Sequence, residues 1–269
     1  MIEKKNNEKL IVTVTLADSL LYLDAHNYPK TPEEIAETAY RCYEEGAAIA
    51  HIHLPKGKCK KTVDLIRDKC DMVIQAGMSS DPIEERKELF ESGSDMISVM
   101  LSHHDEYFPV SRENRLHLKE ELEDYCRLCR KTKIKPEFET WHLGSVWSLN
   151  YLIERNLVDK PYFLTLFFNW PGGNWSPATP DEFFHRIKYL PVDSVISVSV
   201  MQTQQKIILP LAIVIGKHVR VGIEDYPYIK EGVLAKDNVE LVKNIIRLSK
   251  EIGREVADPS EAKKIIGLP

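Results

Sequence analysis

Short apolar segments alternate with amphipathic segments eight times along this chain of 269 residues. Short apolar runs are typical of buried strands, and longer amphipathic runs are typical of helices. Eight such pairs in a chain of this length predict an α/β fold, a (β/α)8 TIM barrel that residues 1–269 form as one domain. The alternative is a doubly wound open sheet, but the glycine-rich turn of such sheets does not follow the first strand.

The predicted strands are rich in β-branched and aromatic residues. They comprise residues 10–16, 47–54, 71–76, 96–100, 135–140, 162–168, 194–200 and 218–223. In the last strand Val219, Val221 and Ile223 recur at every second position, and the run ends in Glu224 and Asp225. Because side chains alternate along a strand, these two carboxylates are expected to face opposite ways.

The predicted helices carry start and stop signals. In the first helix Thr31 is placed as the N-cap and Pro32 takes the first helical position. Glu34 completes a capping box, and Gly46 ends the helix. The seventh helix contains Pro210, which must lie in its first turn or kink it. The eight helices comprise residues 31–45, 62–69, 82–92, 116–131, 146–155, 181–190, 206–215 and 238–252.

Two further segments lie outside this alternation. A long polar connection precedes the fourth helix, and its residues His103 and His104 are expected at the surface or along the pocket. The C-terminal extension, residues 257–269, contains a short extra helix over residues 259–268 that closes the barrel or reaches a neighbouring subunit. This tail is expected to be poorly buried in a single barrel, which favours a homo-oligomer.

The composition argues against several classes of partner. The net charge is −5 and the basic residues are scattered among acidic ones, so nucleic acid is not expected as a partner. Residues 1–9 are polar and the apolar run after them is short, so neither a secretion signal nor a membrane span is expected. Five cysteines, an odd number with no second C-x-x-C pair, suit a reducing, cytoplasmic environment. Cys126 and Cys129 form a C-x-x-C pair inside a predicted helix, which favours a structural role.

Polar residues at the ends of two predicted strands indicate a metal site. His51 and His53 close the second strand, and their imidazoles are expected to point together because residues two apart share a face. Glu224 closes the eighth strand. Two imidazoles and one carboxylate suit a divalent transition metal such as Zn²⁺, with one position left for water or substrate.

Each of these clusters also has a simpler interpretation. A histidine pair on a strand is often structural or solvated, and Glu224 with Asp225 is also typical of a helix cap. A barrel favours the metal, because its first and last strands are neighbours and its chemistry lies at the C-terminal ends of the strands. His51, His53 and Glu224 all lie at such ends.

Several stretches resemble the motifs of a known family. They are residues 31–35 (TPEEI), 46–48 (GAA) before the histidine pair, 136–139 (PEFE), 170–173 (WPGG), 220–225 (RVGIED) and the C-terminal run 235–268. Together they resemble the β-keto acid cleavage enzyme family over essentially the whole chain. The resemblance implies a zinc-dependent TIM barrel, assembled as a homo-tetramer. It also implies a reaction in which a β-keto acid and acetyl-CoA yield acetoacetate and a new CoA thioester.

The resemblance also implies roles for individual residues. By position the metal ligands are His51, His53 and Glu224, and the catalytic residues are Asp225 as base, Arg220 beside it, and Glu139. The substrate-binding positions are Asp18, Gly77, Ser79, Ser98 and Gly172. In an ideal strand Arg220 would share a face with Glu224 and not with Asp225, so the pairing of Arg220 with Asp225 comes from the resemblance alone.

Departures from the family pattern concern the substrate pocket. Met78 interrupts a loop of small hydrogen-bond donors, Met100 replaces an asparagine, and Gln202 and Thr203 stand where the family has a Gly-Arg pair. These changes predict a more apolar pocket that handles charged amino-keto acids poorly. Two other functions stay open: another metal-assisted C–C lyase or hydrolase reaction without CoA, or a zinc-binding barrel without turnover.

Overall fold

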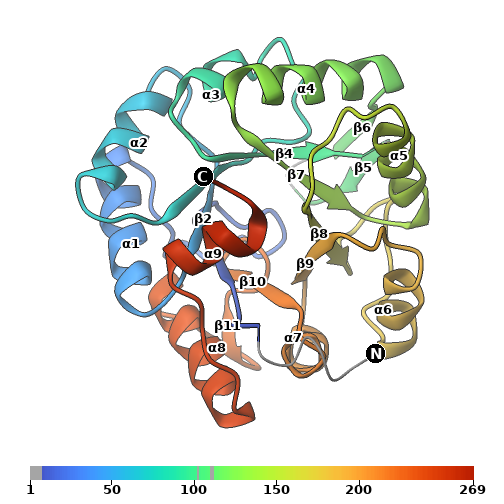
Figure 1. Cartoon of the computed structure of the whole chain (residues 1–269). Helices are drawn as coiled ribbons and strands as arrows, with labels where there is room; N and C mark the ends of the chain where they lie inside the picture. Colours follow the sequence, from blue (N-terminus) through green and yellow to red (C-terminus); the bar gives the residue numbers. More distant parts are fainter. Residues whose placement is uncertain (1–7, 102, 110–111) are drawn as a thin grey trace.

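The computed structural model describes residues 8–101, 103–109 and 112–269. Eight parallel strands close a barrel in the order β1-β10-β9-β8-β7-β4-β3-β2, with helices around it (Figure 1). The (β/α)8 barrel predicted from the sequence is therefore confirmed. Of the polar N-terminal stretch, residues 1–7 lie outside the described residues.

Four of the barrel strands have the predicted bounds, and the other four are shorter than the apolar runs that predicted them. They are β1 Val12–Thr15, β2 Ile49–Ile52, β3 Val73–Ala76, β4 Met96–Met100, β7 Lys135–Thr140, β8 Tyr162–Phe168, β9 Ser194–Val200 and β10 His218–Gly222. The register of β1 shows how the barrel closes, because Thr15 pairs with His51 on one side and with Gly222 on the other. Closure therefore brings the ends of β2 and β10 together across a single strand.

The helices follow the predicted order, and all but the helix over residues 238–252 have shifted ends. They are α1 Pro32–Glu44, α2 Cys59–Arg67, α3 Lys87–Glu91, α4 Lys119–Thr132, α5 Leu143–Glu154, α6 Pro180–Ile187, α7 Gln205–Val214, α8 Asn238–Ile252 and α9 Pro259–Ile266. The capping box of Thr31 and Glu34 is present in α1. Pro210 lies inside α7, beyond its first turn. Cys126 and Cys129 lie on the buried face of α4, within the hydrophobic core.

Two antiparallel hairpins were not predicted. β5 (His103–Tyr107) pairs with β6 (Arg112–Leu116), and β11 (Tyr228–Lys230) pairs with β12 (Val233–Leu234). The prediction that the fourth helix begins at residue 116 was wrong, because Leu116 belongs to β6 and α4 begins at Lys119. Both strands of the first hairpin are polar, so they lack the apolar pattern that identified the barrel strands.

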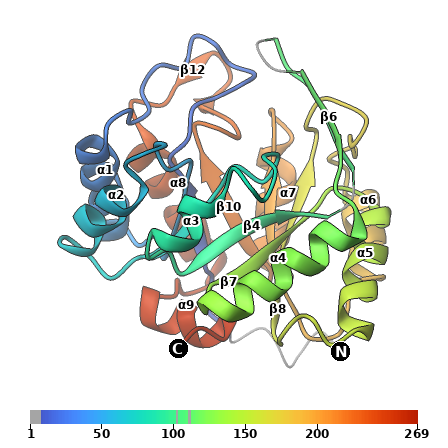
Figure 2. The same cartoon turned by 90° about the horizontal axis from the view of Figure 1, so that it is seen from above.

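α9 closes the end of the barrel opposite the β5–β6 hairpin (Figures 1 and 2). Ala257, Ala262 and Ile266 are at most 1% exposed, and they pack on bottom-layer residues such as Ile49 and Phe163. The expectation of a poorly buried tail was therefore wrong. In the described part of the chain, no helix combines the length and apolar character needed to cross a bilayer.

Candidate active site

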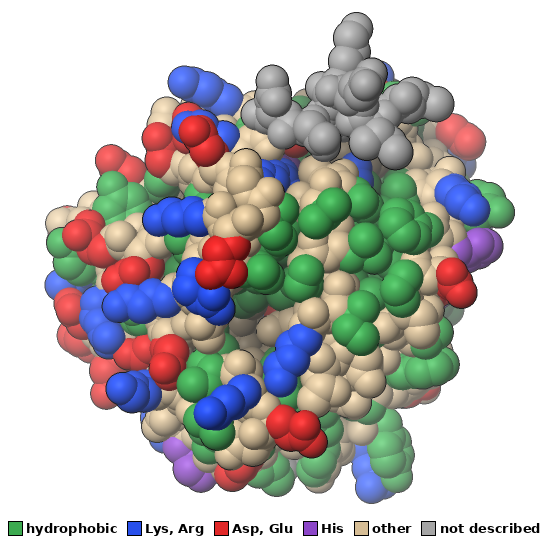
Figure 3. Space-filling model, turned by 90° about the horizontal axis from the view of Figure 1, so that it is seen from below, with side chains coloured by type: hydrophobic (Ala, Val, Ile, Leu, Met, Phe, Trp, Pro, Cys, Tyr) green, Lys and Arg blue, Asp and Glu red, His purple; other side chains and the backbone are tan. Residues whose placement is uncertain are grey.

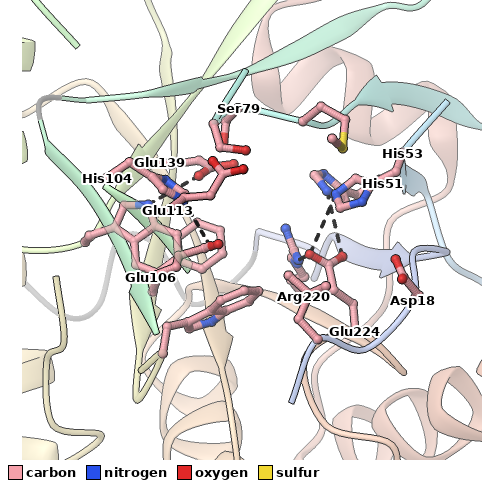
Figure 4. Close-up of a pocket in the computed structure, with 16 residues that line it drawn as sticks. Asp18, His51, His53, Ser79, His104, Glu106, Glu113, Glu139, Arg220 and Glu224 are labelled. Atoms are coloured by element: carbon pink, nitrogen blue, oxygen red, sulfur yellow. Dashed lines mark hydrogen bonds and ion pairs between the residues drawn. The ribbon is translucent and has the colours of Figure 1, made fainter. Parts of the chain in front are cut away.

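A cavity of about 290 Å³ opens at the C-terminal ends of the barrel strands. Its two sides are chemically different, as Figure 4 shows. His51, His53, Arg220 and Glu224 lie on one side, and a cluster of acidic residues with His104 lies on the other (Figure 4). The cavity is thus where the strand-end residues were predicted to meet.

The three expected metal ligands form a compact group. Atoms of His51, His53 and Glu224 that can bind a metal all lie within 4.8 Å of one another. Nε2 of His51 is 3.8 Å from Glu224 Oε2, and Nε2 of His53 is 3.9 Å from Glu224 Oε1. Burial, and then Arg220, lowers the pKa of His51 well below its usual value, so its imidazole is neutral and its lone pair is free to bind a metal. The triad could therefore hold a metal ion.

Gly77 leaves the space in which the two imidazoles lie. A Cβ at this position would be 2.5 Å from Cδ2 of His53 and 2.9 Å from Nε2 of His51. Any side chain here would displace the ligands. The buried Arg86 donates a hydrogen bond of 2.8 Å to the Gly77 carbonyl and so holds the loop in place. The space left by Gly77 is therefore evidence that the triad binds a group, because the protein keeps this volume clear for the two imidazoles.

Arg220 connects the triad to Asp225. Its guanidinium lies 2.8 Å from Oε1 of Glu224 and 2.9 Å from Oδ1 of Asp225. Both carboxylates reach it because β10 ends at Gly222 and the chain then turns, with the N–H groups of Asp225 and Tyr226 donating to the Gly222 carbonyl. The expectation that the two carboxylates face opposite ways was therefore wrong. It assumed that the strand continued through residue 223.

The two carboxylates have opposite pKa shifts. Burial would raise the pKa of Glu224, but the positive charge of Arg220 outweighs it, and the pKa is lowered to about 2. Burial raises the pKa of Asp225, against the lowering effect of Arg220. Asp225 is 0% exposed and also accepts a hydrogen bond of 3.0 Å from Ser199. It therefore lies behind Arg220, outside the cavity lining.

The remaining predicted residues divide into two groups. Asp18, Ser79 and Glu139 line the cavity, and Glu139 accepts a hydrogen bond of 3.2 Å from the indole of Trp141. Ser98 lies inside the barrel, where it accepts a hydrogen bond of 3.1 Å from Gln75. Gly172 lies against the β5–β6 hairpin.

Three cavity residues come from the β5–β6 hairpin. They are His104, Glu106 and Glu113. Of these three residues only His104 was predicted, as a surface or pocket residue, and the two glutamates were missed. The alternation of side chains along β5 and β6 was the available signal, but it has meaning only once the two strands are known to pair.

The pocket is not as apolar as the sequence predicted. Met78 lines the cavity, but Met100 is 1% exposed and packs with Phe108 and Met201 below an aromatic wall. In that wall Trp141 stacks on Phe167 with ring centroids 4.5 Å apart. The predicted apolar pocket therefore describes one part of the cavity and leaves out its acidic side.

Comparison with known proteins identifies the family. Residues 9–268 match the family model for β-keto acid cleavage enzyme. The chain belongs to the β-keto acid cleavage enzyme family. It is 33% identical to the 3-keto-5-aminohexanoate cleavage enzyme of Acetoanaerobium sticklandii, over 97% of this chain and 99% of that one. It is 32% identical to the enzyme of the same name from Fusobacterium nucleatum, over 97% of this chain and 98% of that one. As a member of this family the protein is an enzyme.

The family barrel also resembles solved structures. A ternary complex of ObcA with a C4-CoA adduct and oxalate matches with a TM-score of 0.74 at 15% identity, covering 90% of this chain and 68% of that one. This likeness concerns the fold alone.

Proposed function

We propose that the protein is a zinc-dependent enzyme that condenses a β-keto acid with acetyl-CoA, giving acetoacetate and a new CoA thioester. The observation that carries the proposal is the triad of His51, His53 and Glu224 on a cavity that also presents Arg220. Relatives that match nearly the whole chain support the reaction class, including the 3-dehydrocarnitine:acetyl-CoA trimethylamine transferase of Rhizobium meliloti, 24% identical over 97% of both chains.

The donor set fits zinc. Two imidazoles and one carboxylate match the three protein ligands of catalytic zinc sites, and the absence of a side chain at Gly77 leaves space for the two imidazoles. When bound, the ion would supply a Lewis acid for the carbonyl of a β-keto acid.

The chain's own residues then bind the substrate and move the proton. Arg220 presents a buried cation at the cavity, suited to hold a carboxylate or an oxyanion. Asp225 is the base in this proposal. Arg220 lines the cavity and Asp225 lies behind it, so Asp225 reaches a substrate only when Arg220 shifts toward that substrate. Glu139, Asp18 and Ser79 contact the substrate from the cavity walls. Ser98 and Gly172 act by holding Gln75 and the β5–β6 hairpin in place.

We also propose that the protein is one domain that assembles as a homo-oligomer, namely a homo-tetramer. α7 is apolar on its outer face as well as its inner face: Ile207 and Val214 are each 55% exposed. Figure 3 shows apolar side chains gathered on the side of the molecule that carries α6, α7 and α8. A helix that is apolar all round is normally covered, so this face fits a second copy of the chain.

The metal is tested by measuring zinc in reconstituted protein by mass spectrometry. We expect about one zinc per chain, and a loss of at least about tenfold in affinity for His51→Ala and for Glu224→Gln, with the fold retained by circular dichroism. His103→Ala is the matched control, because His103 lies on the hairpin, outside the triad. Wild-type protein that stays free of metal after reconstitution would overturn the zinc proposal.

The reaction is tested with a panel of charged and apolar β-keto acids, assayed with and without acetyl-CoA while CoA-ester formation is followed. We expect acetoacetate and a new CoA ester only when acetyl-CoA is present. Cleavage that is independent of acetyl-CoA would indicate a lyase or hydrolase reaction. Bound zinc without turnover of any substrate would indicate a barrel that has lost catalysis.

A further inference from the structure

Thr15 lies between the two strands that carry the triad. In the register of β1 it pairs with His51 of β2 on one side and with Gly222 of β10 on the other. Thr15 is 0% exposed and does not line the cavity. It was not among the residues predicted for the site. Its place in β1 therefore allows it to contact the triad without contacting a substrate.

The hydroxyl of Thr15 holds one oxygen of the Glu224 carboxylate. It donates a hydrogen bond to Oε2 of Glu224, while the guanidinium of Arg220 lies 2.8 Å from Oε1. Hydrogen bonds to an ionised acceptor are stronger than those between neutral groups. A separate donor on each oxygen restricts rotation of the carboxylate, so Glu224 keeps its orientation toward His51 and His53 (Figure 4).

The backbone at Gly222 brings Glu224 and Thr15 together. A Cβ at position 222 would lie 2.5 Å from the carbonyl oxygen of Thr15, so any side chain there would push the end of β10 away from β1. The chain turns directly after Gly222, where the N–H groups of Asp225 and Tyr226 donate to the Gly222 carbonyl. A backbone feature and a side-chain hydrogen bond thus place Glu224 against Thr15 independently.

Thr13 shows that the contact is particular to Thr15. It lies two residues earlier on β1, so its side chain shares the face of Thr15, and it is 3% exposed. Its neighbours in the register are Ile49 and Arg220, and Oγ1 of Thr13 has no hydrogen-bond partner within the described part of the chain. Thr13 therefore offers a matched control, since it is the same residue type on the same strand without the contact to Glu224.

We propose that Thr15 is a positioning residue whose hydroxyl holds Glu224 in the orientation that binds the metal ion. This inference rests on the zinc site of the proposed function and adds a residue outside the ligand set. Groups that orient metal ligands typically change the affinity for the metal by about ten- to a hundredfold. Without the hydroxyl, Oε2 of Glu224 loses its donor, and the carboxylate must be ordered when the metal binds.

The test measures the transfer of zinc from the loaded full-length protein to a chromogenic chelator, which needs no substrate. We expect Thr15→Val and Thr15→Ala each to bind zinc about ten- to a hundredfold more weakly than the wild type. Valine keeps the volume of threonine and alanine reduces it, so a loss that both variants share is due to the hydroxyl. Thr15→Ser keeps the hydroxyl and should bind zinc within about threefold of the wild type.

The control variant Thr13→Val should bind zinc as the wild type does, and circular dichroism checks the fold of every variant. Equal zinc affinity in the wild type, Thr15→Val and Thr15→Ala would overturn the inference and leave the zinc site intact. A loss in Thr15→Ser as large as that in Thr15→Ala would also overturn it, because it would indicate a packing role. Wild-type protein that holds no zinc would overturn the zinc site and this inference together. Zinc binding without turnover would count against the proposed reaction alone.

Discussion

Glu137 shows how the barrel interior changes the chemistry of one residue. It is 1% exposed, and Gln75 donates a hydrogen bond of 2.8 Å to it. Burial, and then the neighbouring Glu139, raises its pKa to about 8. The carboxyl group is therefore protonated inside the folded protein at neutral pH.

This raised pKa predicts a dependence of stability on pH. At pH values between 4.5, the usual pKa of a glutamate, and about 8, the folded state binds a proton that the unfolded state has released. The contribution of this group to stability is therefore present at low pH and is lost as the pH rises. The unfolding free energy should decline less steeply with pH over this window in Glu137→Gln. The change in slope should correspond to up to about one bound proton. Urea unfolding at several pH values measures it. Equal slopes for the variant and the wild type would contradict the assignment.

Among the elements, the β5–β6 hairpin depends on one glycine. Gly172 has a φ of +134°, and a Cβ there would lie 1.9 Å from the Asp105 carbonyl oxygen. A side chain at position 172 must therefore push the hairpin away from the 170–174 turn. Because the hairpin carries part of the cavity wall, a backbone feature outside the cavity controls its shape.

We predict that Gly172→Ala raises KM for the substrate about tenfold or more and lowers the unfolding free energy by about 1–3 kcal/mol. Steady-state kinetics and thermal unfolding measure the two effects. Gly253→Ala is the control, because Gly253 also has a positive φ, +87°, but has nothing within 4 Å of the added Cβ. It should lose stability without a change in KM. An unchanged KM for Gly172→Ala would show that the hairpin does not shape the substrate site.

α9 acts at the other end of the barrel. Ile266 is 0% exposed and packs in the cluster that contains Ile11, Val73 and Phe163. We expect Ile266→Ala to cost about 2–4 kcal/mol, because it leaves a cavity in a packed layer. The same change at Ile252, which is 36% exposed, should cost much less. Urea unfolding of both variants provides the comparison, and equal losses would show that α9 is only loosely attached.

At the scale of the whole molecule, the apolar outer face of α7 predicts self-association. Light scattering should give a multiple of the 31.0 kDa chain mass. Ile207→Glu/Val214→Glu should shift the protein toward the monomer, because it places charge on the covered face. Val192→Glu is the control, since Val192 is 94% exposed and lies outside α7. A wild-type species of single-chain mass at all working concentrations would contradict the oligomer.

The sequence by itself determined the barrel and the three residues that could hold a metal ion. Eight apolar runs separated by helices with local caps are short-range patterns, and each can be read from a few neighbouring residues. His51, His53 and Glu224 follow from the same patterns, because each lies at the end of a predicted strand and a barrel gathers those ends.

Only the tertiary structure decided what surrounds the triad. The contact of Arg220 with Asp225 depends on where β10 stops, and the burial of the C-terminal tail depends on a bottom layer contributed by distant strands. Glu106 and Glu113 reach the cavity because two polar strands pair and then bond to the 170–174 turn. These contacts join residues far apart in sequence, and their energy comes from pairing and packing that local composition does not encode.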